Sequence, residues 1–249
     1  MNKLILSILL IASILFSSCD ILNSVAQTTA EVLTESGSSS GSYTPSSLDM
    51  GNALKDALQL GITKGSDRLS ATNGYFGNSL LKIVMPPEAK KVENTLRDLG
   101  MNKLVDDAIL SFNRGAEKAA KEAAPIFIHS IKQMTFNDAK NILLSGNKKS
   151  ATEFLRRTTY SSLNNTFTPV IDRSLKSVNA TKYWGDVINT YNQIPLVEKV
   201  NPDLTAYVTE KALDGLFKMV EKEEAKIRDD INSRTTDLLQ KVFGWADKQ

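Results

Sequence analysis

The stretch TFNDAKNILLSG, residues 135–146, carries the signals that decide the fold of this chain. Thr135 precedes Asp138 by three residues, which is the pattern of a capping box: each side chain bonds to the backbone N–H of the other at a helix N-terminus. Gly146 can end the helix, because glycine readily takes the left-handed conformation found after many helices. The stretch therefore predicts a short helix with a local signal at each end.

Two other segments carry the same N-terminal pattern. Ser46 stands three residues before Asp49, and Ser150 stands three residues before Glu153. Apolar residues that follow these pairs recur with the period of one helix face. Both pairs therefore predict capping boxes at the starts of helices.

Helix signals fill most of the chain after residue 47, and only segments 79–86 and 194–200 look extended. We therefore predict an all-α fold, a single bundle-like domain over residues 48–244 followed by a short tail, residues 245–249. About 200 residues are enough to bury one sizeable core. The expected helices cover residues 46–65, 87–99, 102–123, 125–134, 135–146, 150–163, 168–177, 181–193, 201–229 and 233–243.

Residues 1–18 have the pattern of a signal peptide. A positively charged start precedes an apolar run, residues 4–16, which is too short to span a bilayer of about 30 Å as a helix. Two serines then precede Cys19, the only cysteine of the chain. This arrangement resembles the lipobox of bacterial lipoproteins, and the resemblance implies that Cys19 becomes the first mature residue and carries acyl groups such as palmitate. The alternative, a cleaved signal with a free thiol, would leave an exposed odd cysteine in an oxidising compartment.

Two or three acyl chains anchor a protein stably to a membrane. We therefore expect a lipid-anchored protein of the bacterial cell envelope, with its domain outside the cytoplasm. Asp20 resembles an inner-membrane retention signal of enterobacteria, but that rule varies between bacteria, so the inner and the outer membrane both stay open. Residues 19–47 are rich in Ser, Gly and Thr, and we expect a disordered tether with a reach of roughly 30 Å.

Four blocks along the chain together resemble a family of bacterial envelope proteins called domain of unknown function 4197. The resemblance covers residues 48–244 and implies an all-helical domain on secreted or lipidated chains, without an established activity. The blocks are KIVMPPEAKKVENTLRDLG (82–100), LSFNRGAEKAAKEAAPIF (110–127), NPDLTAYVTEKALDGLFKMVEKEEAKIR (201–228) and RTTDLLQKVFG (234–244).

The residue inventory argues against several kinds of chemistry. His129 is the only histidine, and we interpret it as a core or surface residue of a helix; a zinc site needs three or four nitrogen or sulfur ligands. The sequence has no glycine-rich phosphate loop and no Gly-x-Ser-x-Gly motif. The formal net charge is only +2, so no nucleic-acid partner is indicated. We expect no metal and no cofactor.

Polar residues on two expected helices form a first candidate site. Arg114 and Glu117 stand three residues apart beside Asn113, among small residues that allow helices to approach closely. One interpretation is an ion pair within the helix, beside a tight crossing. The other is a partly buried site in which these residues meet Glu224 and Arg228, four residues apart on another helix. We hypothesise that Arg114 pairs with Glu224 in a buried network.

Aromatic pairs beside glycines form a second candidate. Tyr75 and Phe76 lie in NGYFGN, and Tyr183 and Trp184 lie in TKYWGD. Such rings can pack against the end of the bundle or line a ligand groove.

Three classes of function remain open. A membrane-tethered interaction or scaffold module, with an envelope protein as its partner, fits the expected anchor, tether and helical domain. A binder of a small envelope ligand is the second class, and a large apolar pocket would favour it. A carboxylate-dependent hydrolase of cell-wall material is the third. The sequence favours binding over catalysis, because the adjacent acidic pairs point about 100° apart on a helix.

Overall fold

The computed structural model describes residues 43–193, 195–196 and 199–249. The predicted signal peptide, the predicted lipidation site Cys19 and the predicted tether as far as residue 42 lie outside the described residues. Within the described part, nine α-helices pack into one domain and no β-strand is present. The prediction of an all-α fold is therefore confirmed.

The longest connections are segment 71–86, between α2 and the short 3₁₀ helix η1, and segment 192–203, between α8 and α9. None of the described helices combines the length and the apolar character that a membrane crossing requires. The elements are α2 Ser47–Ser70, η1 Pro87–Ala89, α3 Lys90–Asp98, α4 Asn102–Ala120, α5 Ala123–Gln133, α6 Phe136–Leu143, α7 Ser150–Lys176, α8 Ala180–Tyr191, α9 Leu204–Asp229, η2 Ile231–Ser233 and α10 Asp237–Ala246.

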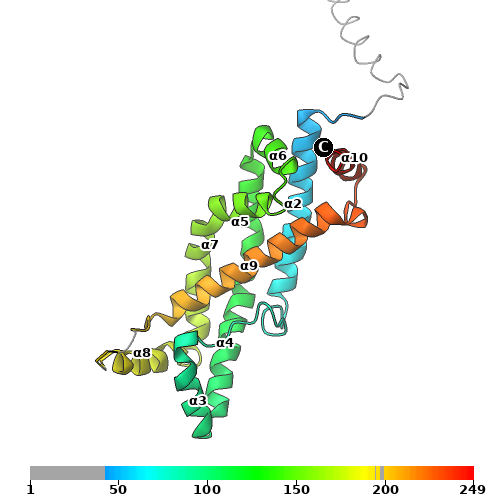
Figure 1. The fold of residues 1–249 in the computed structure, drawn as a ribbon. Coiled ribbons are helices and arrows are strands. Elements are labelled where there is room, and N and C mark those ends of the chain that lie inside the picture. The colour runs from blue at the N-terminus through cyan, green and yellow to red at the C-terminus, as the bar shows by residue number, and fades with distance from the viewer. Residues whose placement is uncertain (1–42, 194, 197–198) are drawn as a thin grey trace, which may run out of the picture. The chain divides into compact units, whose positions relative to one another are not determined.

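Three long helices, α2, α4 and α7, run roughly along one another, and α9 crosses them diagonally (Figure 1). Helices α5 and α6 pack against α2 at one end of the domain, where α10 also contacts α2. At the other end, α3 lies beside the start of α4, and α8 contacts α7 and α9. The long helix α9 contacts all three of these helices and also α8, so it links the two ends of the domain.

Small residues let the long helices approach closely. A side chain built at Gly61 or Gly65 of α2 would lie 3.3 Å from Glu223 Cβ or 3.1 Å from Met219 Cγ of α9. A side chain at Gly115 of α4 would lie 3.2 Å from Ser174 Cβ of α7. The helix crossings in the core therefore depend on residues that have little or no side chain.

Two of the three predicted capping boxes are present. The Ser46 hydroxyl accepts a hydrogen bond from the Asp49 N–H, and the Asp49 carboxylate accepts one from the Ser46 N–H. Thr135 and Asp138 make the same reciprocal pair. Hydrogen bonds from Thr135, first from its hydroxyl and then from its backbone, hold the pKa of Asp138 below its usual value.

The predicted capping box of Ser150 and Glu153 is wrong. Ser150 is already inside α7, and its hydroxyl donates to the carbonyl of Ile142 at 3.1 Å. Glu153 accepts a hydrogen bond from the side chain of Asn147 instead. The start of α7 is bound by Glu224, a residue from a distant helix, which no local pattern can reveal.

Helix α7 also runs through Pro169, where the sequence suggested separate helices over residues 150–163 and 168–177. A proline inside a helix removes one hydrogen bond and costs about 3 kcal/mol. Burial compensates for that cost, because four residues spaced one turn apart are fully buried on one face of α7: Leu163, Phe167, Ile171 and Leu175. The apolar stripe therefore keeps the helix continuous.

Two further sequence predictions need adjustment. Helix α10 begins at Asp237, capped by Thr236, and continues through Gly244 instead of ending before it. Segment 79–86, predicted to be extended, forms turns and irregular backbone without strand pairing, and segment 194–200 lies partly outside the described residues.

Segment 71–86, which connects α2 to η1, is attached to the bundle through Tyr75. The Tyr75 ring is fully buried, and its hydroxyl donates to the carbonyl of Ala212 in α9 at 2.8 Å. Burial, with a smaller contribution from the Glu117 charge, raises the pKa of the Tyr75 hydroxyl far above its usual value. The ring lies against Gly215, where a Cβ would stand only 2.7 Å from Tyr75 Cε1.

We predict that Gly215→Ala destabilises the domain by about 1–3 kcal/mol, because the added methyl overpacks against a ring that cannot move away. Gly244→Ala is the matched control: nothing lies within 4 Å of a Cβ at this position in α10, so the change should stabilise by up to about 1 kcal/mol through helix propensity. Urea unfolding followed by circular dichroism measures both. Equal effects of the two variants would contradict the proposed packing of Tyr75.

Candidate functional site

The polar residues singled out from the sequence form two separate clusters in the structure: Asn113, Arg114 and Glu117 in one, and Glu224 and Arg228 in the other. Arg114 donates to Glu117, and Arg228 donates to Glu224. No hydrogen bond joins the two clusters among the described residues. The expected pair of Arg114 with Glu224 is therefore wrong, because each carboxylate instead binds a different stretch of backbone.

Glu117 of α4 holds the buried part of segment 71–86. Its Oε1 accepts hydrogen bonds from the backbone N–H groups of Tyr75 and Phe76, both at 3.2 Å. Its Oε2 accepts a hydrogen bond from Arg114, whose guanidinium also donates to the side chain of Asn73 at 2.9 Å. Asn73 has a φ of 69°, a left-handed conformation that asparagine tolerates better than most residues. One oxygen of the Glu117 carboxylate thus binds the backbone of the turn at residues 73–76 directly, and the other binds it through Arg114.

Asn113 binds the same segment a few residues later. Its side-chain amide accepts from the Ile83 N–H at 2.9 Å and donates to the Ile83 carbonyl at 2.8 Å, so it imitates the pairing of a neighbouring strand. The Tyr207 hydroxyl of α9 donates to the next carbonyl, that of Val84, at 3.2 Å. Helices α4 and α9 therefore hold the segment from two sides.

Glu224 of α9 binds the start of α7. It accepts hydrogen bonds from the backbone N–H groups of Ala151 and Thr152, at 3.0 and 2.8 Å, and from the Thr152 hydroxyl at 2.8 Å. The first N–H groups of a helix have no partner within the helix, and a negative charge there is favoured by the helix dipole. Glu224 therefore acts as an N-cap supplied by another helix.

Arg228, one turn after Glu224, binds the end of α6. Its guanidinium donates to the carbonyls of Ile142 and Leu143 at 2.9 and 3.5 Å, and to the Ser150 hydroxyl at 3.0 Å. A cation at a helix C-terminus is the favourable counterpart of an anion at an N-terminus. One ion pair on α9 thus joins the end of α6 to the start of α7.

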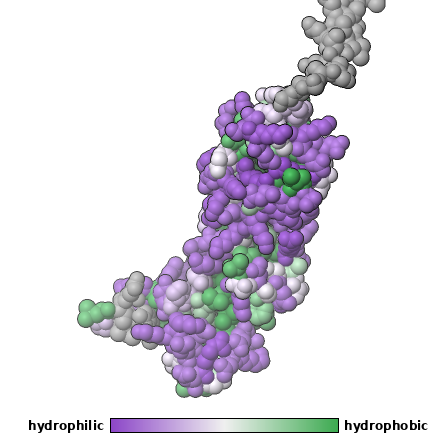
Figure 2. All heavy atoms as spheres, turned by 45° about the vertical axis from the view of Figure 1, so that its right-hand side comes forward, coloured by the Kyte–Doolittle hydropathy of each residue, from purple (hydrophilic) through white to green (hydrophobic). Residues whose placement is uncertain are grey.

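The second pair of predicted residues, Tyr183 and Trp184 on α8, lies beside an apolar groove of about 670 Å³. The groove is enclosed by segment 85–89, α3, the first half of α4, α8 and the start of α9. Figure 2 shows a largely hydrophilic surface on which hydrophobic residues gather just below the middle of the view, above a mostly hydrophilic lower tip. The apolar residues lining the groove are Met85, Ala89, Val92, Leu96, Met101, Leu104, Val105, Ala108, Phe112, Val178, Ala180, Tyr183, Trp184, Val187 and Leu204.

Polar groups at this groove are few and already have partners. The Trp184 indole N–H donates to the Asn201 carbonyl at 3.3 Å. Glu93 is bonded to Lys90 and Arg97. Burial works to raise the pKa of Glu93, but the hydrogen bonds and charges of those two cations outweigh it and hold the pKa below its usual value. The remaining acid, Asp107, pairs with Lys103.

The sequence pointed to the α8 aromatics of this groove and missed the residues of α3 and α4. Those residues come from several helices, so no single periodic pattern brings them together. The exposure of Met101, one of the α4-side residues at the groove, is seen only in the structure.

The acidic pairs of the sequence diverge in the structure. Asp106 pairs with Arg97, while Asp107 pairs with Lys103. Within residues 43–193, 195–196 and 199–249, no three side chains among His, Cys, Asp and Glu are grouped as a metal site would require. His129 lies exposed on α5.

We predict that Glu224→Ala destabilises the domain by about 3–5 kcal/mol, because it leaves the N–H groups at the start of α7 without their acceptor and removes the ion-pair partner of the half-buried Arg228. Glu221→Ala is the control on the same helix: its ion pair with Lys149 is exposed and should contribute less than about 1 kcal/mol. Urea unfolding measures both changes. A double-mutant cycle between Arg114 and Glu224 should give a coupling energy near zero, and a coupling above about 1 kcal/mol would contradict the separation of the two clusters.

Comparison with known proteins adds a family and no activity. A family model described as "Protein of unknown function (DUF4197)" matches residues 44–244. No curated protein and no solved structure matches the chain. The match spans nearly all of the helical domain, including both polar clusters and the apolar groove, and the chain therefore belongs to the DUF4197 family of proteins of unknown function.

Proposed function

We propose that this chain is a membrane-tethered lipoprotein of the bacterial envelope whose helical domain binds a hydrocarbon chain in the apolar groove between α3, α4 and α8. The observation that carries the proposal is the groove itself. Its volume of about 670 Å³ falls within the range of roughly 300–1,000 Å³ typical of small-ligand sites. This favours a ligand-binding role over a scaffold without a ligand.

The chemistry of the lining favours a hydrocarbon over a polar ligand. Apolar side chains dominate the walls, and the carboxylates at the groove, Glu93 and Asp107, are neutralised by neighbouring cations. A buried methylene gains about 0.8 kcal/mol on leaving water, so an acyl chain gains affinity from such walls without needing a charged partner. A polar ligand would lose its hydration there with little compensation.

The edge of the groove supports the same interpretation. Tyr183 is 50 % exposed and Met101 is 43 % exposed, although both side chains are largely apolar and lie where several apolar residues meet. Contiguous apolar surface on a folded domain usually marks a site of contact. Methionine is well suited to such a site, because its flexible side chain adapts to different ligand shapes.

The anchor and the ligand fit the same environment. The apolar run at residues 4–16 and the position of Cys19 support lipidation and export, which would place the domain beside a membrane, where acyl chains are abundant. An interaction with an apolar segment of an envelope protein is the alternative occupant of the groove.

We predict that the purified full chain carries lipids that mass spectrometry can identify after organic extraction, and that Ala108→Phe removes them. Ala108 lines the groove and is half-buried, so a larger side chain fills the space without entering the core. Ala206→Phe, on an exposed position of α9 outside the lining, is the control and should keep the lipids.

The same two variants decide between the occupants. A chain that carries no noncovalently bound lipid, and does not bind a fluorescent fatty acid, contradicts the hydrocarbon proposal. Crosslinking of a protein partner that Ala108→Phe abolishes and Ala206→Phe does not would assign the groove to a protein instead.

We also predict that Cys19→Ser abolishes incorporation of labelled palmitate and releases the protein from membranes washed at high salt and alkaline pH. The helical circular dichroism of the domain should stay unchanged, because Cys19 lies far before α2 in the sequence. Membrane association of the Cys19→Ser protein that survives both washes would contradict the lipoprotein assignment.

A further inference from the structure

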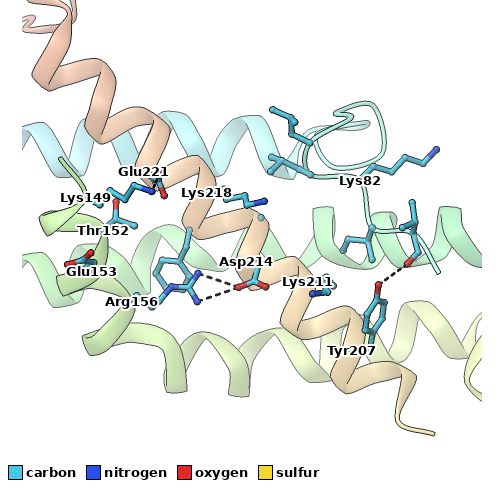
Figure 3. A pocket seen from close by; sticks show the side chains of 16 residues that line it. Lys82, Lys149, Thr152, Glu153, Arg156, Tyr207, Lys211, Asp214, Lys218 and Glu221 are labelled. Atoms are coloured by element: carbon cyan, nitrogen blue, oxygen red, sulfur yellow. Dashed lines mark hydrogen bonds and ion pairs between the residues drawn. The ribbon is translucent and has the colours of Figure 1, made fainter. Parts of the chain in front are cut away.

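A second groove, of about 580 Å³, has a different character from the apolar one. It lies between segment 80–84, the face of α9 that includes Lys211, Asp214, Lys218 and Glu221, and the first turns of α7 (Figure 3). Cations outnumber acids among its lining residues: Lys82, Lys149, Arg156, Lys211 and Lys218 face Glu153, Asp214 and Glu221. The groove therefore carries an excess of positive charge in a chain whose net charge is close to zero.

The acids of this groove are already engaged. Glu221 pairs with Lys149 at 2.8 Å, and the hydrogen bond and charge of Glu221 raise the pKa of Lys149. Asp214 pairs with Arg156 at 3.3 Å, and Glu153 accepts a hydrogen bond from Asn147. Among the described residues, no ion pair joins these carboxylates to Lys211 or Lys218.

Two lysines on α9, Lys211 and Lys218, are not held in close ion pairs within the described part of the chain, so their charges can act on a ligand. Among the described residues Lys218 has no ion pair, and Lys211 approaches Glu210 at 3.9 Å and the centre of the Tyr207 ring at 5.8 Å. The two lysines are seven residues apart on one face of the helix, a rise of about 10 Å, which two four-carbon side chains can bridge. Asp214 and Gly215 lie between them along the helix: the buried Tyr75 ring covers Gly215, and the Asp214 carboxylate pairs with Arg156 across the groove.

Arg156 supplies a third cation from the opposite wall. Its guanidinium lies 4.4 Å from the ring centre of Phe217, and this contact positions it over the floor of the groove. Its pair with Asp214 is long and about 40 % exposed on each side, and such exposed pairs contribute at most about 1 kcal/mol. The arginine can therefore exchange this carboxylate for a stronger anion at little cost.

We propose that this groove binds a phosphate group, carried by a phospholipid headgroup or by a soluble phosphate ester, through Lys211, Lys218 and Arg156. Phosphate suits these cations, because arginine donates two parallel hydrogen bonds to it and lysine binds it as a point charge. Leu80 and Val84, 83 % and 51 % exposed, stand at the rim, where they can contact an apolar part of the same ligand.

The site is separate from the apolar groove and does not depend on the proposed function. Its three cations belong to α7 and to the middle of α9, and none of them lines the groove between α3, α4 and α8. Failure of one proposal therefore leaves the other unaffected.

Lysine footprinting of the full chain tests the proposal. The rate of acetylation of each lysine is measured by mass spectrometry, with the protein in neutral detergent with and without glycerol phosphate, and in detergent micelles that contain either phosphatidylglycerol or diacylglycerol, a lipid without phosphate. A ligand at twice its Kd leaves about one third of the sites free, so Lys211 and Lys218 should react about threefold more slowly. Lys222, exposed on the same helix but outside the groove, is the internal control.

The two arms distinguish the source of the phosphate. Protection by glycerol phosphate indicates a soluble ester, and protection by phosphatidylglycerol alone indicates a lipid headgroup; either result supports the site. In the arm that protects, Lys218→Gln should remove the protection of Lys211, and Lys222→Gln should leave it unchanged. Absence of protection in both arms, equal protection of Lys222, or unchanged protection of Lys211 in Lys218→Gln would overturn the proposal.

Discussion

Two buried carboxylates fix the loop after α2 and the start of α7, because they accept hydrogen bonds from backbone N–H groups that have no acceptor within their own segment. Helix starts and buried loops contain N–H groups that cannot be left without an acceptor. Glu117 accepts from two such groups in segment 71–86, and Glu224 accepts from two more at the start of α7. Each carboxylate is in turn paired with an arginine of its own helix. The walls of the charged groove follow from this, because segment 80–84 belongs to the connection that Glu117 holds and the start of α7 is held by Glu224.

Local signals predicted the parts of the fold that depend on neighbouring residues. The capping boxes at Ser46 and Thr135 and the all-α class follow from patterns within a few positions. The start of α7 could not be predicted in this way, because its acceptor is Glu224, separated by 73 and 72 residues from the N–H groups that it binds. The predicted break of the helix at Pro169 was wrong for a related reason. The lost hydrogen bond is a local cost that the sequence shows, whereas the burial of Phe167 and Ile171 that outweighs it depends on other helices.

For the candidate site residues, too, the sequence showed local features but not contacts with distant segments. The small residues around Arg114 indicated a tight crossing, which Gly115 provides against α7, but the sequence could not show that Glu117 would be taken by a loop. Tyr183 and Trp184 were recognised as aromatic residues beside a turn, while the other walls of their groove come from helices that are distant in sequence. The charged groove has no sequence signature, since its cations belong to α7, α9 and segment 80–84 and alternate with acids along each helix.

The position of α9 near the end of the chain has a consequence for the order in which the domain folds. The contacts that fix the first third of the domain include Tyr75 with Ala212, Arg68 with Glu223 and Val84 with Tyr207, at sequence separations of 137, 155 and 123 residues. Closing such long loops is slow compared with forming a helix. A nascent chain that ends before α9 can form α2 and α4, but it lacks the partners that hold the segment between them. Native packing of the N-terminal half therefore waits for the last fifth of the polypeptide.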